Sequence, residues 1–367
     1  MNNKKIAFFI TSLDSGGIEN YLLRFLNHYQ EEIDAIVYCK SGKLGVLEKE
    51  YLAVGATLIP HSLGFFNLFD YMWLYKDLKD KGIDAVCDFT GNYAALPLLT
   101  AKIARINKRL AFFRGSTRHF KETSLRLFYD KLMNKILYLN ATQILSNSKA
   151  ALDFFFPVKV SQNKNFFKVI YNGIEALKFL STKEDLRKEL NIPKEAFVVG
   201  HVGRVAQAKN HETILDVAIE LTKNEKDIYF LSCGSQTIEK FSSIVNLNRL
   251  DKKIKLLGQR RDIIKVLNTL NCFYFPSHTE GQPNALLEAM LVGVPFVASN
   301  IPPIKEITPA MYQEFLTPPR DKSAAILKIR SIKEMNYEEL KIFKELSFQI
   351  KEQFKAEKMF KKFYNTL

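Results

Sequence analysis

Two cations five residues apart on one predicted loop could hold a diphosphate. Gly203 and Arg204 follow a predicted strand at 197–200, and Lys209 precedes a predicted helix at 212–221. Arginine presents a planar fork of N–H donors and lysine a mobile point charge, so the two side chains can neutralise a diphosphate from two sides. A solvated loop would carry the same charges, so this spacing alone does not distinguish binding from solvation.

A second segment, residues 275–290, places two carboxylates eight residues apart. Glu280 precedes a predicted helix and Glu288 lies on its second turn, in a stretch that is otherwise apolar. A carboxylate there is costly unless it is paired or hydrogen-bonded, and ribose hydroxyls would be suitable partners. A solvent-facing Glu288 is the ordinary alternative. The first turn of the helix would also present backbone amides to a ligand, those of Asn284, Ala285 and Leu286.

A glycine-containing loop, residues 14–20, connects the first predicted strand to the first predicted helix. Gly16 and Gly17 let the backbone approach a ligand closely, and a helix N-terminus favours anions. The loop has neither the Gly-x-Gly-x-x-Gly pattern nor the Gly-Lys-Ser/Thr of a Walker loop. A tight strand-to-helix turn explains it equally well.

Predicted strands and helices alternate along the chain, and this pattern favours parallel sheets covered by helices on both faces. It restarts after the turn signal Asn172-Gly173. We therefore expect an α/β protein with two Rossmann-like, doubly wound domains facing a central cleft, residues 1–170 and 171–340, followed by a helix at 341–367. The predicted strands of the first domain are 5–10, 35–38, 57–60, 84–89, 110–113 and 142–146.

The net charge of +14 is unevenly distributed over the 367 residues. The segment from Lys102 to Lys168 contains fourteen basic residues and only three acidic ones, Glu122, Asp130 and Asp153. Such a field attracts nucleic acid, an anionic membrane or a phosphorylated substrate. Because aromatic residues are interleaved with these cations, we expect part of the stretch to dock on an anionic membrane surface. The aromatics that would enter the membrane interface are Phe120, Phe128, Phe154, Phe155 and Phe156. Alternatively, the charges are scattered and solvated, and these aromatics belong to the core.

The compartment follows from three features. The apolar run that ends at Ile10 is shorter than a signal-peptide core of about 7–15 residues. No run approaches the roughly 18 apolar residues of a membrane span. The four cysteines form no Cys-x-x-Cys pair and are expected to be small buried side chains in a reducing compartment. We expect a cytoplasmic protein, peripheral at the inner face of the plasma membrane.

Taken in order, these motifs resemble those of the retaining GT-B glycosyltransferases of family four, the bacterial group 1 enzymes that build polysaccharides and glycolipids. The likeness covers nearly the whole chain, and the Glu280–Glu288 segment followed by Gly293-Val294-Pro295 is its most specific part. The other segments that carry it are Gly16–Glu19, Val169–Glu175 and Gly203–Asn210.

The resemblance implies a retaining transferase that uses a nucleotide-diphosphate sugar, UDP- or GDP-linked, as substrate and needs no cofactor or metal. Arg204 and Lys209 would neutralise the leaving diphosphate, and Glu280 would bind the donor sugar; these three are the implied catalytic residues. Glu288 would hold the ribose. The remaining implied donor-binding residues are Gly17, Gly203, Asn284, Ala285 and Leu286. The acceptor would be a glycan or a lipid-linked sugar, and the last helix would cross back to the first domain.

One position departs from the family pattern. Many relatives place a histidine just after the strand that corresponds to 110–113, whereas Arg114 stands there in this chain and His119 follows five residues later. Gly16, Arg114 and His119 are therefore the candidates near the reaction and the acceptor. Either Arg114 lies near the reacting sugar, or His119 reaches back from the next loop.

Other classes of function would explain parts of this sequence. A basic nucleic-acid- or membrane-binding protein without transferase activity would use the charge but would leave Glu280 and Glu288 unexplained, so we expect no nucleic-acid partner. A sugar phosphorylase or an epimerase of the same fold would need residues that this sequence does not display. A degenerate relative would be expected to lack the intact set of two cations and two glutamates.

Overall fold

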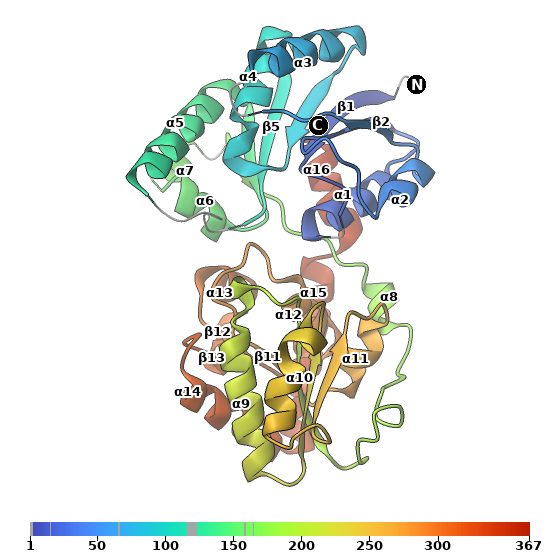
Figure 1. The fold of residues 1–367 in the computed structure, drawn as a ribbon, viewed down its shortest axis with the longest axis vertical. Coiled ribbons are helices and arrows are strands. Elements are labelled where there is room, and N and C mark those ends of the chain that lie inside the picture. The colour runs from blue at the N-terminus through green and yellow to red at the C-terminus, as the bar shows by residue number, and fades with distance from the viewer. Residues whose placement is uncertain (1–2, 15, 65–66, 116–122, 158, 164) are drawn as a thin grey trace. The chain divides into compact units, whose positions relative to one another are not determined.

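The computed structural model describes residues 3–14, 16–64, 67–115, 123–157, 159–163 and 165–367. The chain forms two compact units (Figure 1). The first comprises residues 1–172 together with 357–367, and the second comprises residues 173–356.

The first unit is built on a sheet of seven parallel strands in the order β3-β2-β1-β4-β5-β6-β7. Parallel strands with helices on both faces are buried on both sides, which explains their continuous apolar runs. In the centre of the sheet, Phe8 pairs with Val37 on one side and with Cys87 on the other, and all three are buried. The strands are β1 (Lys4–Ile10), β2 (Ile33–Cys39), β3 (Thr57–Pro60), β4 (Ala85–Asp88), β5 (Lys108–Phe113), β6 (Gln143–Ser146) and β7 (Phe167–Val169).

The helices of this unit cover the sheet through one apolar face each. In α1 the residues that point inward are spaced by three and four positions, as the helical repeat requires: Tyr21, Leu22, Phe25 and Leu26. The helices are α1 (Gly17–His28), α2 (Glu48–Ala53), α3 (Leu68–Asp80), the 3-10 turn η1 (Gly91–Ala94), α4 (Ala95–Ile103), α5 (Ser124–Asn140), α6 (Lys149–Phe155) and α7 (Lys159–Gln162).

The end of the chain completes the first unit. Helix α16 (Ala356–Tyr364) packs its aromatic face on α1, with the Phe363 ring 4.6 Å from that of Phe25 and the Phe360 ring 5.8 Å from that of Tyr21. The single helix expected at 341–367 is wrong in one respect. The structure has two helices, and α15 (Tyr337–Gln353) belongs to the second unit, so the segment that returns to the first unit begins at Glu357.

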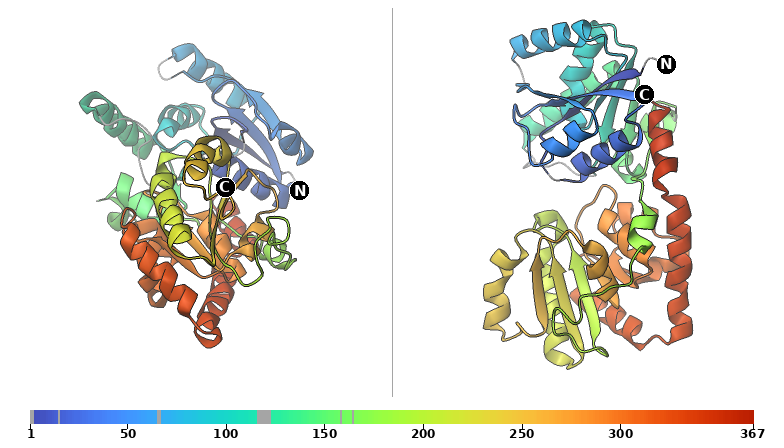
Figure 2. Two further views of the ribbon diagram at one scale, coloured as in Figure 1. Left: turned by 60° about the horizontal axis from the view of Figure 1, so that its bottom comes forward. Right: turned by 90° about the vertical axis from the view of Figure 1, so that its right-hand side faces the viewer.

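The second unit has a sheet of six parallel strands in the order β10-β9-β8-β11-β12-β13, with helices on both sides (Figure 2). Its strands are β8 (Phe197–Val202), β9 (Ile228–Cys233), β10 (Ile254–Gly258), β11 (Cys272–Phe275), β12 (Phe296–Ser299) and β13 (Leu316–Thr317). Besides α15, its helices are α8 (Ala176–Leu180), η2 (Gln207–Lys209), α9 (His211–Asn224), α10 (Thr237–Leu247), α11 (Ile263–Thr269), α12 (Asn284–Val292), α13 (Pro302–Ile307), η3 (Ala310–Phe315) and α14 (Lys322–Glu334).

Both sheets are doubly wound, which confirms the predicted fold class. In each sheet the strand order reverses once, between β1 and β4 in the first unit and between β8 and β11 in the second. Ligands of such sheets bind outside the carboxyl ends of the strands at this point, because the loops there diverge and leave a crevice. The loops that follow these four strands are therefore the places to look for a site.

Candidate functional site

The reversal point of the second sheet brings together two loops that carry predicted site residues. The loop after β8 holds Gly203, Arg204 and Lys209, and the loop after β11 holds Glu280. Since β8 and β11 are hydrogen-bonded neighbours, both loops leave the same edge of the sheet.

Lys209 and Glu280 form an ion pair. Lys209 Nζ donates to Glu280 Oε1 at 2.7 Å, and the ammonium lies 4.8 Å from the centre of the Phe275 ring. The Glu280 side chain is 11% exposed and that of Lys209 is 21% exposed. A largely buried pair of this kind holds both side chains in place, and the exposed remainder leaves a face from which a ligand can reach them.

Asn210 fastens the two loops to each other. Its backbone is left-handed, with φ 59° and ψ 47°, a conformation that asparagine tolerates better than most residues. Its Nδ2 donates to the carbonyl oxygens of Pro276 at 3.0 Å and Pro319 at 2.7 Å. The amide of His278 donates to the carbonyl of Ala208 at 2.8 Å. The bonds to Pro276 and from His278 fix the loop that carries Lys209 against the loop that carries Glu280, and the bond to Pro319 attaches it to the loop after β13.

A glycine just after the neighbouring strand β9 allows the Arg204 loop to approach closely. Gly234 has φ +154°, and a Cβ there would collide with the Gly203 carbonyl. The Gly203 amide donates to the Cys233 carbonyl at 2.8 Å, so the loop continues the ladder past the end of β8. Arg204 follows and is exposed. The loop backbone is therefore fixed while the guanidinium is open to solvent.

A buried histidine, which the sequence analysis did not single out, supports this loop from below. His201 on β8 is fully buried, and its Nδ1 lies 3.0 Å from the Tyr274 carbonyl. Burial, with a smaller effect of nearby His211, lowers the pKa of His201 to about 3. The imidazole is neutral at physiological pH and acts as a packed polar group beneath Gly203. In the sequence, the position of His201 within the apolar run of β8 could have indicated that this histidine is buried.

Helix α12 supplies the last predicted donor residues. It begins at Asn284 after Pro283, and its first intrahelical bond in this turn runs from Leu287 N to Pro283 O at 3.1 Å. The amides of Asn284, Ala285 and Leu286 precede that bond and lie where a helix dipole favours an anion. Glu288 is on the second turn and is partly exposed, whereas the Leu286 side chain is buried. Leu286 can therefore contribute its backbone only.

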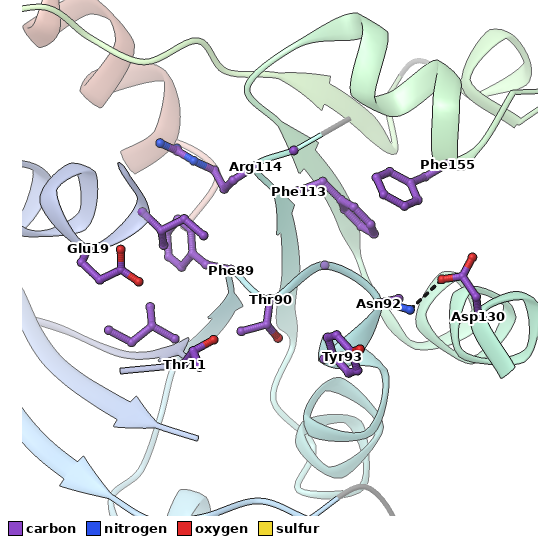
Figure 3. A pocket seen from close by; sticks show the side chains of 14 residues that line it. Thr11, Glu19, Phe89, Thr90, Asn92, Tyr93, Phe113, Arg114, Asp130 and Phe155 are labelled. Atoms are coloured by element: carbon purple, nitrogen blue, oxygen red, sulfur yellow. Dashed lines mark hydrogen bonds between the residues drawn. The ribbon is translucent and has the colours of Figure 1, made fainter. Parts of the chain in front are cut away.

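The first unit has its own cavity, of about 270 Å³, at the reversal point of its sheet (Figure 3). Glu19 on α1 and Arg114 after β5 line it, together with Thr11 and η1. The Arg114 guanidinium lies over the Tyr21 ring at 4.0 Å and is near the Phe112 ring at 4.9 Å. Burial lowers the pKa of Arg114 to about 10, so the side chain keeps its charge at neutral pH.

The two glycines of the first loop lie at the start of α1. Gly16 precedes the helix and Gly17 opens it. A Cβ on Gly16 would collide with the Glu19 carboxylate, whereas a Cβ on Gly17 would meet open space. Gly17 therefore leaves room at the helix N-terminus. His119, the alternative to Arg114, lies outside the described residues.

A buried carboxylate in this cavity was missed by the sequence analysis. Asp130 on α5 is 1% exposed and accepts a hydrogen bond from Asn92 Nδ2 at 2.7 Å (Figure 3). In the sequence it counted only as one of three acids opposing a basic stretch. Asp130 stands three residues before Met133 and seven before Leu137, both buried, so it lies on the same face of the helix. This spacing in the sequence could have indicated that Asp130 points inward.

A second cavity of about 340 Å³ adjoins the first and shares Thr11, Thr90, Asn92 and Tyr93 with it. Tyr71 of α3 and Tyr129 and Met133 of α5 add an aromatic and apolar wall. Lys40 also lines it, but its Nζ is bonded to Asp88 at 3.0 Å, to Thr90 at 2.7 Å and to the Tyr93 carbonyl at 2.9 Å. Lys40 thus fixes the loop after β4.

The basic stretch is less uniform than its sequence indicates. Arg109 Nε donates to the Asn140 carbonyl at 2.7 Å, Lys108 Nζ donates to the Leu367 carbonyl at 2.8 Å, and Lys159 lies 3.6 Å from the Tyr138 ring. These cations hold the fold together. Phe156 is buried, so its expected place at a membrane interface is wrong, and Phe155 is partly buried against the core. Phe128 and Phe154 are exposed. Phe120 and Lys121 lie outside the described residues.

Within the described ranges, every helix is too short or too polar to cross a bilayer.

Comparison with known proteins agrees with this architecture. Residues 182–349 match the family model of glycosyl transferases group 1. The capsular polysaccharide biosynthesis glycosyltransferase CapH of Staphylococcus aureus is 29% identical over 309 residues, which cover 83% of each chain. The Escherichia coli UDP-Gal:alpha-D-GlcNAc-diphosphoundecaprenol alpha-1,3-galactosyltransferase is 28% identical over 74% of this chain and 72% of its own.

Solved structures show the same fold along the whole chain. HepE of Anabaena, crystallised with UDP and glucose, has a TM-score of 0.81 at 18% identity and covers 99% of both chains. A glycosyltransferase from Rickettsia africae has a TM-score of 0.81 at 18% identity and covers 100% of this chain and 98% of its own. The chain therefore has the GT-B fold, and its segment 182–349 is similar to the group 1 glycosyl transferases.

Proposed function

We propose that the protein is a retaining transferase that moves a sugar from a nucleotide-diphosphate sugar to a glycan or lipid-linked acceptor during assembly of a bacterial surface polysaccharide. The observation that carries the proposal is the ion pair between Lys209 and Glu280, 2.7 Å apart, at the reversal point of the second sheet. One side chain suits a leaving diphosphate and the other suits sugar hydroxyls, so the pair marks the place where the bond between them would break.

In this proposal the second unit binds the donor. Arg204, exposed on its fixed loop, and Lys209 neutralise the diphosphate as it leaves, and the amides at the start of α12 add further donors. Glu288 accepts hydrogen bonds from the ribose, and Glu280 orients the donor sugar. Because two cations supply the positive charge, we propose that no metal is required. A UDP- or GDP-linked sugar fits this set; the HepE structures with UDP and with UDP-glucose support the former.

The first unit binds the acceptor in this proposal. Gly16 and Gly17 let the acceptor approach the backbone at the start of α1, and Arg114 replaces the histidine that the family pattern led us to expect. The cavity of the first unit that Arg114 lines has carboxylates, hydroxyls and aromatic rings in its wall, and this mixture suits a sugar with both polar edges and apolar faces. The names of the relatives, which include capsule and O-antigen enzymes, support a polysaccharide role. A place at the inner face of the plasma membrane is part of the same proposal.

Donor binding can be tested without knowing the acceptor. Purified protein should be titrated calorimetrically with a panel of UDP- and GDP-sugars, and one member should bind. The Lys209→Ala variant should bind it at least tenfold more weakly, since a charge-assisted bond contributes about 1.5–3 kcal/mol. Lys240→Ala, which removes an exposed lysine from α10, is the matched control and should bind normally. If no nucleotide sugar binds, or if both variants bind alike, the donor assignment is wrong.

The retained configuration needs its own test. Once donor and acceptor are identified, proton NMR of the first product should show the anomeric configuration of the donor. An inverted product would overturn that part of the proposal and leave the donor site intact.

A further inference from the structure

The outer face of α5 carries an apolar stripe that is exposed to solvent. Leu125 is 78% exposed, Phe128 66%, Leu132 42% and Leu139 60%. Their spacing of three, four and seven residues places all four on one side of the helix. The opposite side packs into the first unit through Met133 and Leu137. Figure 1 shows α5 on the outside of that unit.

The same face is cationic. Lys131 and Lys135 are exposed and stand three residues after Phe128 and Leu132, respectively, beside the stripe. Asp130 is the acid of this helix, and it points inward to Asn92 with 1% exposure. The exposed side of α5 therefore combines apolar groups with positive charge and, within 124–140, presents no carboxylate.

A second exposed apolar group lies at the start of α3. Leu68 is 69% exposed, Phe69 79% and Met72 59%. Tyr71, in the same part of α3, lines the cavity of about 340 Å³, just as Tyr129 and Met133 line it from α5. The two exposed apolar groups are thus on helices that wall the same cavity.

We propose that the stripe of α5, together with the first turn of α3, docks the protein on an anionic bilayer surface. Leucine and phenylalanine side chains enter the interface between headgroups and acyl chains, while the adjacent lysines bind lipid phosphates. An exposed stripe of apolar groups alone would suit a second protein equally well. The accompanying cations, with the helix's one acid turned inward, favour an anionic lipid surface.

The inference deepens the proposed function, and rests on it, because it connects the membrane to the acceptor cavity. A helix with its side chains is about 10–12 Å across. The outer face of α5 meets the bilayer while its inner face, through Asp130, Tyr129 and Met133, lines both cavities of the first unit. A sugar held on a lipid at the bilayer surface then needs to rise only about one helix diameter to enter them.

Vesicle sedimentation of the full-length protein tests the docking. The protein should pellet with vesicles containing phosphatidylglycerol and stay in solution with pure phosphatidylcholine vesicles. Binding should weaken from low salt to 0.5 M salt because ions screen the lysines. Lys131→Glu/Lys135→Glu should reduce partitioning by at least about fivefold per charge, and Leu125→Ser/Phe128→Ser should reduce it at every salt concentration.

Matched variants in the second unit control for nonspecific effects. Leu247 and Phe348 are 83% and 70% exposed, and Lys240 and Lys252 are exposed lysines. Leu247→Ser/Phe348→Ser and Lys240→Glu/Lys252→Glu should bind vesicles like the parent. Circular dichroism should show that all four variants remain folded; because the altered side chains are exposed, we expect unchanged melting.

Three outcomes would overturn the docking proposal: binding that ignores lipid charge, α5 variants that bind like the controls, or α5 variants that change only the oligomeric state in gel filtration. The last result would assign the stripe to self-association. Nucleotide-sugar binding and transfer to a water-soluble acceptor should be unchanged in the α5 variants. If the parent protein itself shows neither nucleotide-sugar binding nor transfer, the proposed function is contradicted and the docking proposal is not.

Discussion

Lys209 Nζ lies 2.7 Å from Glu280 Oε1, although 71 residues separate the two in the sequence. The contact exists because β8 and β11 are neighbours and because Asn210 bonds the loop after one strand to the loop after the other. A charged pair held this way keeps both groups in place before a ligand arrives. This lowers the cost of assembling a binding site.

The first prediction concerns this pair. Lys209→Met and Glu280→Gln should each lower kcat/KM by tenfold or more, since each loses a charge-assisted contact of about 1.5–3 kcal/mol. The double variant should lose less than the sum, because residues in one network are coupled. The Lys265–Glu184 ion pair on the surface of the same unit is the control, and Lys265→Met should leave kcat/KM unchanged. Strict additivity would contradict a functional pair.

The second prediction concerns the two predicted donor residues that lie outside this pair. Arg204→Ala and Glu288→Ala should each abolish measurable transfer while leaving thermal unfolding unchanged, because both side chains are at least partly exposed and would act on the donor rather than on the core. Lys240→Ala and Glu239→Ala, on exposed positions of α10, are the controls. Near-normal turnover in both site variants would refute this donor assignment.

The third prediction concerns the stability that Asn210 gives to the loop that carries Lys209. Asn210→Ala removes the bonds to the Pro276 and Pro319 carbonyls and leaves a left-handed backbone without the residue type that tolerates it. Unfolding in urea should show a loss of about 2–4 kcal/mol, from unsatisfied carbonyls and backbone strain. Asn210→Gly relieves the strain and should recover part of the loss. Equal stability of Asn210→Ala and the parent protein would show that these bonds are unimportant.

The fourth prediction is a pH dependence of stability. The pKa of His201 is about 3 in the folded protein and about 6.5 in an unfolded chain. The folded state therefore favours the neutral imidazole, and its contribution is complete above pH 6.5 and declines as the pH falls from 6.5 towards 3. Between pH 7 and pH 5 the free energy of unfolding should fall by about 1–2 kcal/mol from this group.

Urea unfolding at both pH values checks this, with His201→Gln as the comparison. That variant is expected to be less stable at pH 7 and to lose the His201 part of the pH dependence. His211 is also affected by burial, which lowers its pKa, so a smaller dependence should remain. A full-sized dependence in His201→Gln would assign the effect to other groups.

The fifth prediction concerns metal. If Arg204 and Lys209 provide the positive charge for the leaving diphosphate, excess EDTA should leave the transfer rate unchanged within error. Activity that disappears with EDTA and returns with magnesium or manganese would show that the cation pair is insufficient.

Several features of the protein are determined by local sequence. The alternation of apolar runs and amphipathic stretches predicted two doubly wound domains, because burial on both faces requires continuous apolar strands. The spacing of Arg204 and Lys209, and that of Glu280 and Glu288, identified loops at the carboxyl ends of strands. Both signals depend on neighbours within about ten residues, and a single sequence shows such neighbours directly.

Other features were decided only by the tertiary structure. The pairing of Lys209 with Glu280 depends on β11 returning to lie beside β8, and the inward direction of Asp130 depends on the face that α5 turns to the sheet. The same holds for the aromatic residues of the basic stretch. Phe128 is exposed and Phe156 is buried, although their compositional surroundings are similar. Burial is set by contacts between residues far apart in the chain, and composition does not record them.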